Sequence, residues 1–204
     1  QTGVSDPSLP LVAGGSDLYV QQPEAFASSS PRLLRRSLPS RIWGDNGSIY
    51  LSATITAEDL KRSQVMNDVI DGIDRFMDLV CSQPVREQAT VGGNIVNASP
   101  IGDMTLLLLA LDAELGIRGS HSGRTVPLRE FFKGYKDLDL DRDEIVEWIR
   151  FDARHRSAHI NFEKVSKRRH LDIASVNSAA CLHVANERIT EAHLSAGGVA
   201  PVPL

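Results

Sequence analysis

Two glycine-rich segments hold the residues best suited to binding an anion. The longer reads QATVGGNIVNASPIGD over residues 88–103 and contains Gly92 and Gly93, and the shorter reads LVAGGSDL over residues 11–18. Backbone N–H groups that a tight turn holds on one side form a nest for an anion. One such turn could bind a phosphate, and two could bind a pyrophosphate. The sequence therefore predicts a site for a dinucleotide, although neither segment has the GxGxxG spacing of a Rossmann motif.

Polar side chains in the longer segment would add contacts to such a ligand. Asn94, Asn97 and Ser99 could donate hydrogen bonds to phosphate oxygens. The Asp103 carboxylate could accept hydrogen bonds from a ribose hydroxyl or from a ring N–H. The same segment also allows a structural interpretation, in which Ser99 or Asp103 caps a helix after an irregular loop. The shorter segment, taken alone, could equally be an ordinary turn.

A basic cluster, KVSKRRHLDIA, occupies residues 164–174 and adjoins an alternating apolar pattern. Clusters of this kind usually form a solvated face. Lys164, however, lies on a predicted strand, where its side chain could point inward. An ammonium group in a cleft could stabilise negative charge that develops on a bound ring during reduction.

Other catalytic or metal-binding arrangements have little support in the sequence. His155 and His159 have the i,i+4 spacing of metal ligands on a helix, but the local pattern predicts a strand and no Cys or carboxylate joins them. We therefore expect no metal site. No Ser-His-Asp, Cys-His or paired-carboxylate pattern stands out, and the GxxxxGK[ST] pattern of phosphate-binding loops is absent.

Length, charge and cysteine content restrict the class of protein. The chain has 204 residues and a net charge of −4, and this acidic balance argues against a nucleic-acid partner. Its longest strongly apolar run, residues 106–111, is far shorter than the ~20 residues that span a bilayer, so no membrane span is expected. The two cysteines are too few for the thiolates of an iron–sulfur cluster and are typical of a reduced, cytoplasmic protein. Because the chain starts at Gln1 with no signal peptide, we interpret it as a fragment.

Hydrophobic periodicity indicates the elements that position these segments. Residues 28–49 contain two prolines and an Asp-Asn-Gly sequence, which predict a loop, a short helix or extended piece, and a tight turn. A strand is expected over residues 49–56. The next helix opens at residues 57–60, with Thr56 as its N-cap and Asp59 as the partner in a capping box.

Two longer helices are predicted after that point. Apolar residues recur with helical spacing from residue 65 to residue 82, so one helix is expected over 65–82. The sequence MTLLLLALDAEL predicts a buried helix over residues 104–115 that ends at Gly116.

The second half of the chain is richer in predicted strands. Residues 114–119 and 124–128 are expected to form a hairpin, followed by a short helix over 128–135. Short turns join the later strands and imply an antiparallel sheet. We place a boundary between a smaller lobe, residues 1–63, and a larger lobe, residues 64–204. The later strands are expected at residues 144–151, 159–166, 174–184 and 188–198.

The order of these segments resembles one known family. The sequences LVAGGSDL, VREQATVGGNIVNASPIGD, LLALDAEL, DEIV, KVSKRRHLDIASVNSAA and SAGGVAPVP follow the order seen in the FAD-binding domain of xanthine dehydrogenases. The same domain is the medium subunit of carbon monoxide dehydrogenase-type molybdenum hydroxylases. The resemblance covers residues 9–203. It implies an α+β chain with the two-lobed vanillyl-alcohol-oxidase-type FAD-binding fold, in which FAD extends between a small α/β lobe and a larger lobe with an antiparallel sheet and flanking helices.

The resemblance also implies which positions contact FAD. The first glycine segment would contact the pyrophosphate and its flanks. Asp103 would lie near the adenosine or ribitol portion, Leu140 over the isoalloxazine ring, and Lys164 beside the carbonyl edge of the flavin. No catalytic residue is implied. The implied cofactor-binding residues are Ala13, Gly14, Gly15, Ser16, Asp17, Leu18, Thr90, Gly92, Gly93, Asn94, Ser99, Asp103, Leu140 and Lys164.

By the same resemblance, the chain would be the FAD-dependent electron-transfer component of a xanthine dehydrogenase-like oxidoreductase. Substrate would be hydroxylated on a molybdopterin-binding subunit, and electrons would pass through an iron–sulfur subunit or domain into FAD and on to NAD or another acceptor. This chain alone would not act on the substrate. Two alternatives remain. The length argues against a stand-alone flavin-dependent oxidoreductase, and the intact Gly92, Gly93 and Lys164 argue against a scaffolding subunit that has lost FAD.

Overall fold

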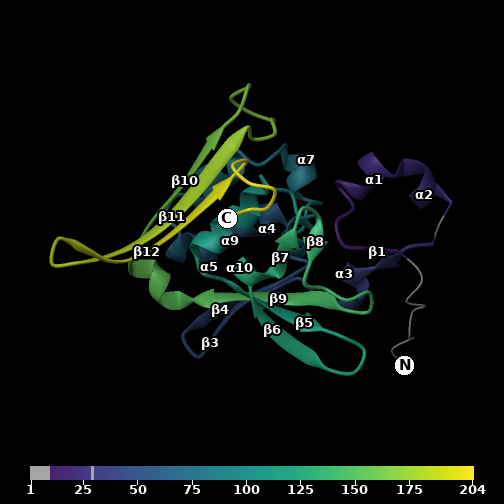
Figure 1. Cartoon of the computed structure of the whole chain (residues 1–204), viewed down its shortest axis with the longest axis horizontal. Coiled ribbons are helices and arrows are strands. Elements are labelled where there is room, and N and C mark those ends of the chain that lie inside the picture. The colour runs from purple at the N-terminus through teal and green to yellow at the C-terminus, as the bar shows by residue number, and fades with distance from the viewer. Residues whose placement is uncertain (1–9, 29) are drawn as a thin grey trace.

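The computed structural model describes residues 10–28 and 30–204, which contain two main antiparallel sheets. In Figure 1 the three-stranded sheet, green to yellow, lies above the five-stranded sheet, and helices fill the space between them. The five-stranded sheet comprises β3 (Ile42–Asp45), β4 (Ser48–Ser52), β9 (Ile145–Asp152), β5 (Glu114–Arg118) and β6 (Gly123–Pro127), in that spatial order. The three-stranded sheet comprises β10 (His159–Val165), β11 (Val176–Ala185) and β12 (Arg188–Gly197).

Short helices surround and separate these sheets. The central ones are α4 (Ala57–Arg62), α5 (Gln64–Val69), α6 (Ile73–Asp78), α7 (Gln83–Arg86), α8 (Val91–Val96), α9 (Asp103–Ala110) and α10 (Leu128–Phe131). A 3₁₀ turn, η1 (Ala153–Ser157), joins β9 to β10. A two-stranded hairpin follows α10 and is formed by β7 (Phe132–Gly134) and β8 (Asp137–Leu138).

The N-terminal part forms a small unit beside the main body, coloured purple in Figure 1. Its two strands pair in parallel, whereas the strands of the larger sheets are antiparallel. The elements of this unit are β1 (Leu11–Val12), α1 (Leu18–Gln21), α2 (Pro23–Ala27), β2 (Arg32–Leu33) and α3 (Leu34–Ser37).

The five-stranded sheet crosses the expected lobe boundary at residue 63. Strand β4 precedes that residue and β9 follows it, yet the two pair directly, with Ile49 opposite Phe151 and Leu51 opposite Ile149. All four side chains are buried in one hydrophobic cluster that extends through α9 to β11. The lobes 1–63 and 64–204 therefore share a sheet, because the pairing of β4 depends on residues about a hundred positions away, which local composition cannot reveal.

Local signals around β4 are confirmed in detail. Asn46 and Gly47 both have positive φ, of 47° and 77°, which is the conformation that a tight two-residue hairpin turn requires. The Asp59 N–H donates to the Thr56 hydroxyl and the Thr56 N–H donates to the Asp59 carboxylate, each over 3.0 Å, so the predicted capping box is present. The strand itself is shorter than expected, since β4 ends at Ser52.

The predicted helix over 65–82 is wrong as a single element. The structure has α5 and α6 in its place, separated at Gly72, which adopts a left-handed φ of 77°. The apolar positions still reach the core, because Met66, Ile73 and Met77 are each at most 1 % exposed. The hydrophobic period therefore identified the buried residues, but it did not reveal the turn at Gly72 that changes the direction of the chain between α5 and α6.

The predicted helix over 104–115 is too long. Helix α9 ends at Ala110, and Gly116 lies inside strand β5 instead of at a helix end. The ring of Trp148, on the neighbouring strand β9, covers this glycine.

The later strands and the hairpin of β5 and β6 are confirmed. The helix expected over 128–135 ends at Phe131, and the chain continues as strand β7. Within the described ranges, no helix is long and apolar enough to cross a membrane.

Gly116→Ala should destabilise the fold. A Cβ at this position would lie 1.9 Å from a Trp148 ring atom, so the indole must shift within a packed sheet. We expect the free energy of unfolding to fall by about 1–3 kcal/mol, measured by urea denaturation. Gly44→Ala is the matched control, because this glycine also lies in a strand but its Cβ would meet only Ser48 O at 3.7 Å. Equal losses in the two variants would contradict the proposed role of Trp148.

Candidate cofactor-binding site

A cavity of about 530 Å³ lies between the first glycine loop, α8 and the segment that leads into β9. Its size falls within the ~300–1,000 Å³ range that is usual for small-molecule sites. Both glycine segments from the sequence contribute to it, although more than seventy residues separate them. The lining residues are Leu11, Ala13, Gly14, Gly15, Ser16, Asp17, Leu18, Gln21, Leu34, Ala53, Ala89, Thr90, Gly92, Gly93, Asn94, Val96, Asn97, Met104, Lys136, Leu140, Glu144, Ile145 and Val146.

The first glycine loop presents free hydrogen-bond donors. In the part of the chain that the structure describes, the backbone N–H groups of Gly14, Gly15 and Ser16 donate to no acceptor. Gly15 has a φ of 74°, a conformation that an L side chain rarely adopts. A Cβ at Gly14 would lie 1.8 Å from the Gln88 carbonyl oxygen, so glycine is required for the close approach of these two backbone segments. The loop is therefore suited to bind an anion through its backbone.

The second glycine segment does not form the turn with open N–H groups that the sequence predicted. It forms the first turn of α8, with Thr90 as the N-cap, and its donors are used within the protein. The N–H groups of Val91 and Gly92 donate to the carbonyls of Ile55 and Ala53, both over 2.8 Å, and that of Gly93 donates to the Thr90 hydroxyl. These donors satisfy the backbone of the buried chain, so they are not available to a ligand.

The glycines of α8 have a packing role instead. A Cβ at Gly92 would lie 2.6 Å from the Ala53 Cβ and 2.8 Å from its carbonyl oxygen. A Cβ at Gly93 would lie 2.7 Å from the Thr90 hydroxyl. The absence of side chains here allows α8 to lie directly on the chain that follows β4. This contact forms the floor of the cavity.

The Asn94 side chain of α8 lines the cavity and also forms hydrogen bonds within the protein. Its Oδ1 accepts hydrogen bonds from the N–H and the hydroxyl of Thr105, over 3.1 and 2.9 Å. These bonds fix the amide, so that its two N–H donors are the groups left for a ligand. Nearby, the Lys136 ammonium donates to the carbonyl and side-chain oxygens of Asn97, which brings a positive charge to the rim.

One wall of the cavity is apolar. Leu140, which the resemblance places over the isoalloxazine ring, contributes to it together with Leu34 and Val146. Glu144 lies at the same wall, where its carboxylate accepts hydrogen bonds from Arg124 Nε and Nη2, both over 2.8 Å. The Arg124 guanidinium holds the pKa of Glu144 below its usual value, so this group is anionic at neutral pH. An aromatic ring could lie against the apolar wall with charged groups at its edges.

Asp103, Lys164 and Ser99 do not line this cavity. Lys164 points inward, as expected, but its ammonium donates to the Asp103 carboxylate over 2.6 Å and to the Leu79 carbonyl over 2.9 Å. The Asn177 amide donates to the other Asp103 oxygen over 2.6 Å. Burial raises the pKa of Asp103, against the opposing effect of Lys164. The next residue in the chain after Asp103 is Met104, which does line the cavity.

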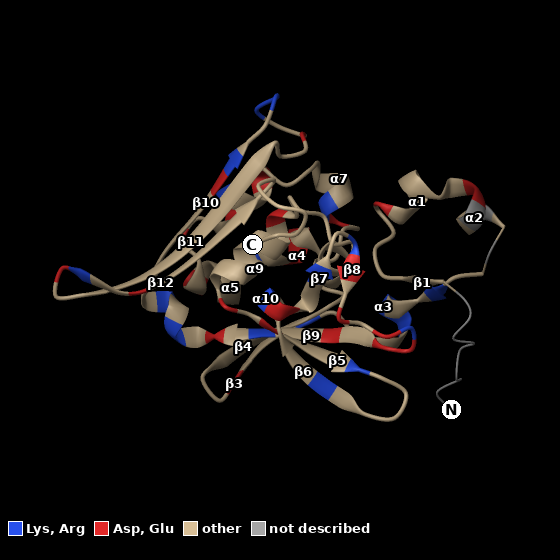
Figure 2. Ribbon diagram, in the orientation of Figure 1, with Lys and Arg blue, Asp and Glu red and all other residues tan. Residues whose placement is uncertain are grey.

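The remaining basic residues of the cluster that contains Lys164 are solvated. Lys167, Arg168 and Arg169 are exposed in the loop between β10 and β11, which is the blue tip at the top of Figure 2. The sequence interpretation of a solvated basic face is thus confirmed for these residues, and Lys164 is the buried exception. Asp103 begins α9 without a side-chain capping bond, so the interpretation of Asp103 as a cap is wrong.

Sequence reasoning missed several lining residues. Lys136 lies in the turn between β7 and β8, where it has a positive φ of 58°. A lysine in a turn does not by itself indicate a binding site. Val96 and Met104 are apolar residues on helices and cannot be distinguished from core residues by pattern. Ala53 and Ala89 line the cavity because the α8 contact brings them there. None of these positions carries a chemical signature in the sequence.

Comparisons with known proteins agree with this fold. The family model described as the FAD binding domain in molybdopterin dehydrogenase matches residues 2–151, and the model described as the CO dehydrogenase flavoprotein C-terminal domain matches residues 162–204. Nicotinate hydroxylase from Emericella nidulans is 34% identical over 138 residues, which is 65% of this chain and 10% of that protein. The chain therefore spans only about a tenth of the length of that relative.

Two further relatives resemble almost the whole chain. The xanthine dehydrogenase FAD-binding subunit from Escherichia coli O157:H7 is 25% identical over 98% of this chain and 70% of its own length. A carbon monoxide dehydrogenase from Hydrogenophaga pseudoflava has a chain that matches with a TM-score of 0.87 at 24% identity, covering 96% of this chain and 69% of that one. The structural match confirms the predicted α+β fold. The chain therefore belongs to the family of FAD binding domains in molybdopterin dehydrogenases, and its cofactor is FAD.

Proposed function

We propose that this chain is the FAD-bearing electron-transfer module of a molybdenum hydroxylase. In this proposal an iron–sulfur subunit delivers electrons, a molybdopterin-binding subunit carries out the hydroxylation, and NAD or another acceptor receives the electrons. The observation that carries the proposal is the cavity with a glycine loop of free N–H donors in a chain of this family. The names of its relatives, a xanthine dehydrogenase FAD-binding subunit and a carbon monoxide dehydrogenase medium chain, support the assignment.

The first glycine loop fits the pyrophosphate of FAD. The N–H groups of Gly14, Gly15 and Ser16 lack acceptors in the described chain and line the cavity, so they could donate to phosphate oxygens. The glycine N–H groups of the second segment, in contrast, are bonded within the protein. We therefore assign the pyrophosphate to the loop at residues 13–18, whereas the second segment would supply the floor and the Asn94 amide.

The apolar wall at Leu140 and Val146 fits the planar ring of the cofactor. FAD supplies the two-electron redox chemistry when bound, and the protein positions and tunes it. Leu140 would exclude water from one face of the ring. Lys136 and Glu144, which carry opposite charges at the lining, would restrict how the polar edges can orient.

The buried pair of Lys164 and Asp103 would act at the edge of the ring, next to Met104. The ammonium side chain is 5% exposed and the carboxylate side chain 12%, so their charges are little screened by water. Because Asp103 offsets the charge of Lys164, the pair should affect the flavin less than an isolated ammonium would. Asp103 would then be a positioning residue that holds Lys164 in place.

A cytoplasmic location stays a prediction. Cys81 and Cys181 are both free thiols, which agrees with a reducing compartment.

The division of labour can be tested on the purified chain loaded with FAD. It should show the visible absorption of bound flavin, yet it should not turn over xanthine or other heterocycles with NAD⁺. Activity should arise only when an iron–sulfur protein and a molybdopterin protein of this class are added. Hydroxylation by the chain alone would overturn the proposed role, and a failure to bind FAD at all would overturn the assignment of the cavity.

Gly14→Ala should weaken FAD binding by about tenfold to a hundredfold, which corresponds to one charge-assisted hydrogen bond of ~1.5–3 kcal/mol. The added Cβ would meet the Gln88 carbonyl at 1.8 Å and push the loop away from the cavity floor. Titration with FAD, followed by flavin fluorescence, measures the effect. Gly44→Ala, at an exposed position on the edge strand β3, should bind FAD like the wild type. An unchanged affinity in Gly14→Ala would remove this loop from the pyrophosphate site.

Lys164→Met should destabilise the protein as well as lower the flavin potential. It leaves the Asp103 carboxylate buried without its cation, and loss of one partner of a buried ion pair costs ~3–5 kcal/mol. Urea denaturation of the FAD-free protein measures this loss, and the double variant Lys164→Met with Asp103→Asn should recover part of it. Lys167→Met, at an exposed position, is the control. A loss as small as that of the control would contradict the stabilising role of the pair.

A further inference from the structure

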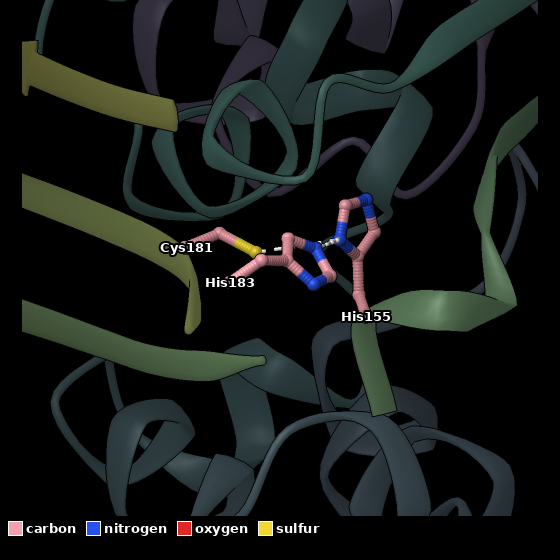
Figure 3. Close-up of side chains that lie close together, drawn as sticks. All are labelled: His155, Cys181 and His183. Carbon is pink, nitrogen blue, oxygen red and sulfur yellow. Dashed lines mark hydrogen bonds between the residues drawn. The ribbon is translucent and has the colours of Figure 1, made fainter. Parts of the chain in front are cut away.

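His155, Cys181 and His183 form a compact cluster, and none of them lines the cavity described above (Figure 3). His155 Nδ1 lies 3.1 Å from His183 Nε2 and 3.3 Å from Cys181 Sγ. All three ligand atoms lie within 4.8 Å of one another. His155 and Cys181 are buried, at 1% and 0% exposure, whereas His183 is only half-buried. In Figure 3 the three side chains converge on one point between η1 and β11.

The cluster differs from the histidine pair that the sequence suggested. His159, four residues after His155, is exposed on β10 and does not join it. The additional members come instead from β11, where Cys181 and His183 lie two positions apart and so point to the same face of the strand. The antiparallel pairing of β10 with β11 brings this strand next to η1, with His159 opposite Leu182.

A backbone contact fixes the protonation pattern of His155. Its Nε2 lies 3.1 Å from the Leu111 carbonyl oxygen, which can only accept a hydrogen bond, so Nε2 carries the proton. In the neutral imidazole, Nδ1 then has a lone pair that faces the other two side chains. A second hydrogen bond of this kind orients histidine ligands in known metal sites. Burial and the neighbouring His183 lower the pKa of His155, which favours this neutral form.

Hydrogen bonds alone do not satisfy the cluster well. The single Nδ1 lone pair of His155 has both the thiol of Cys181 and Nε2 of His183 as close neighbours. It can accept from one of them along its axis, but not from both. If the proton of His183 is on Nδ1 instead, two lone pairs face each other at 3.1 Å. A cation placed between the three atoms would bind all three lone pairs at once.

Two of the three separations match the coordination sphere of zinc, and the third, between Cys181 and His183, is within 4.8 Å. Zn²⁺ binds nitrogen at ~2.0–2.1 Å and thiolate sulfur at ~2.3 Å in tetrahedral sites, which gives N···N edges near ~3.3 Å and N···S edges near ~3.6 Å. The observed separations of 3.1 and 3.3 Å are within a few tenths of an ångström of these edges. We propose that His155 Nδ1, Cys181 Sγ and His183 Nε2 form a Zn²⁺ site, with the fourth position open to water on the half-buried side of His183.

Binding of Zn²⁺ would require the loss of the Cys181 proton. Burial raises the pKa of this thiol to about 11, with Glu191 adding to the effect and Arg154 opposing it. The charged groups around the cluster are paired with each other, since Arg154 donates to Glu191 over 2.6 and 2.7 Å and His193 lies 2.7 Å from the same carboxylate. A thiolate formed at Cys181 would therefore be balanced mainly by the metal. Binding should release about one proton for each Zn²⁺.

Such a site would join two parts of the chain. His155 lies in η1, directly after the five-stranded sheet, whereas Cys181 and His183 belong to the three-stranded sheet. A metal that binds both parts would hold the three-stranded sheet against η1. Zn²⁺ should therefore raise the thermal midpoint of unfolding, because the three ligands come together only in the folded chain.

The test starts from the whole chain treated with a chelator and then titrated with Zn²⁺. Calorimetry in two buffers of different ionisation enthalpy should give one Zn²⁺ per chain and about one released proton. Co²⁺, used as a spectroscopic substitute, should produce a thiolate-to-metal charge-transfer band. Cys181→Ser and His183→Gln should each weaken Zn²⁺ binding by more than ~100-fold, beyond the effect of losing an outer-shell contact. Cys81→Ser and His159→Gln are the matched controls and should bind like the wild type.

Several results would overturn the site. These are a stoichiometry well below one, a Co²⁺ spectrum without a thiolate band, or equal Zn²⁺ affinity in the wild type and Cys181→Ser. The Co²⁺ spectrum uses only the wild type, so it decides the question even if a variant fails to fold. Protection of the Cys181 thiol from alkylation by bound Zn²⁺, with Cys81→Ser as the background, is an independent measurement on a protein that retains all three ligands. Unprotected alkylation would contradict the proposal.

Discussion

The cavity depends on close contact between three stretches of backbone. The Gly92 N–H donates to the Ala53 carbonyl over 2.8 Å, and a Cβ at Gly92 would collide with Ala53. On the other side, Gly14 lies so close to Gln88 that a Cβ would come within 1.8 Å of its carbonyl oxygen. These contacts set the separation of the first loop, the end of β4 and α8. Because these stretches of backbone are continuous with the sheet and the helices, they cannot shift as easily as a side chain can.

Helix α9 connects this arrangement to the rest of the molecule. After Thr105 it is entirely apolar, and it packs in the core between the sheets, with Leu106 at 0% exposure. At its N-terminal end Thr105 holds the Asn94 amide of α8, and Asp103 holds Lys164 of β10. The cavity floor, the buried ion pair and the three-stranded sheet are therefore parts of one packed unit.

The accuracy of the sequence predictions follows the range of the interactions involved. The turn at Asn46 and Gly47 and the capping box at Thr56 were predicted correctly, because each depends on residues within a few positions. The continuous helix over 65–82 was wrong, since Gly72 turns the chain without disturbing the apolar period. Gly116 was assigned to a helix end, whereas its true neighbour is Trp148 on another strand. The predicted hairpin of β5 and β6 is confirmed, whereas the pairing of β4 with β9 was not predicted, because pairing between distant strands is a long-range property.

Residue types and their order determined the family, the FAD cofactor and the glycine segments that meet at one cavity. Only the tertiary structure decided which of those glycines offer free donors. The N–H groups of Val91 and Gly92 donate to the chain after β4 and that of Gly93 to the Thr90 hydroxyl, whereas those of Gly14 and Gly15 have no acceptor in the described chain. In the same way, only the folded chain brings Cys181 to His155. The physical reason is that hydrogen-bond satisfaction and side-chain convergence depend on partners distant in sequence, which no local pattern encodes.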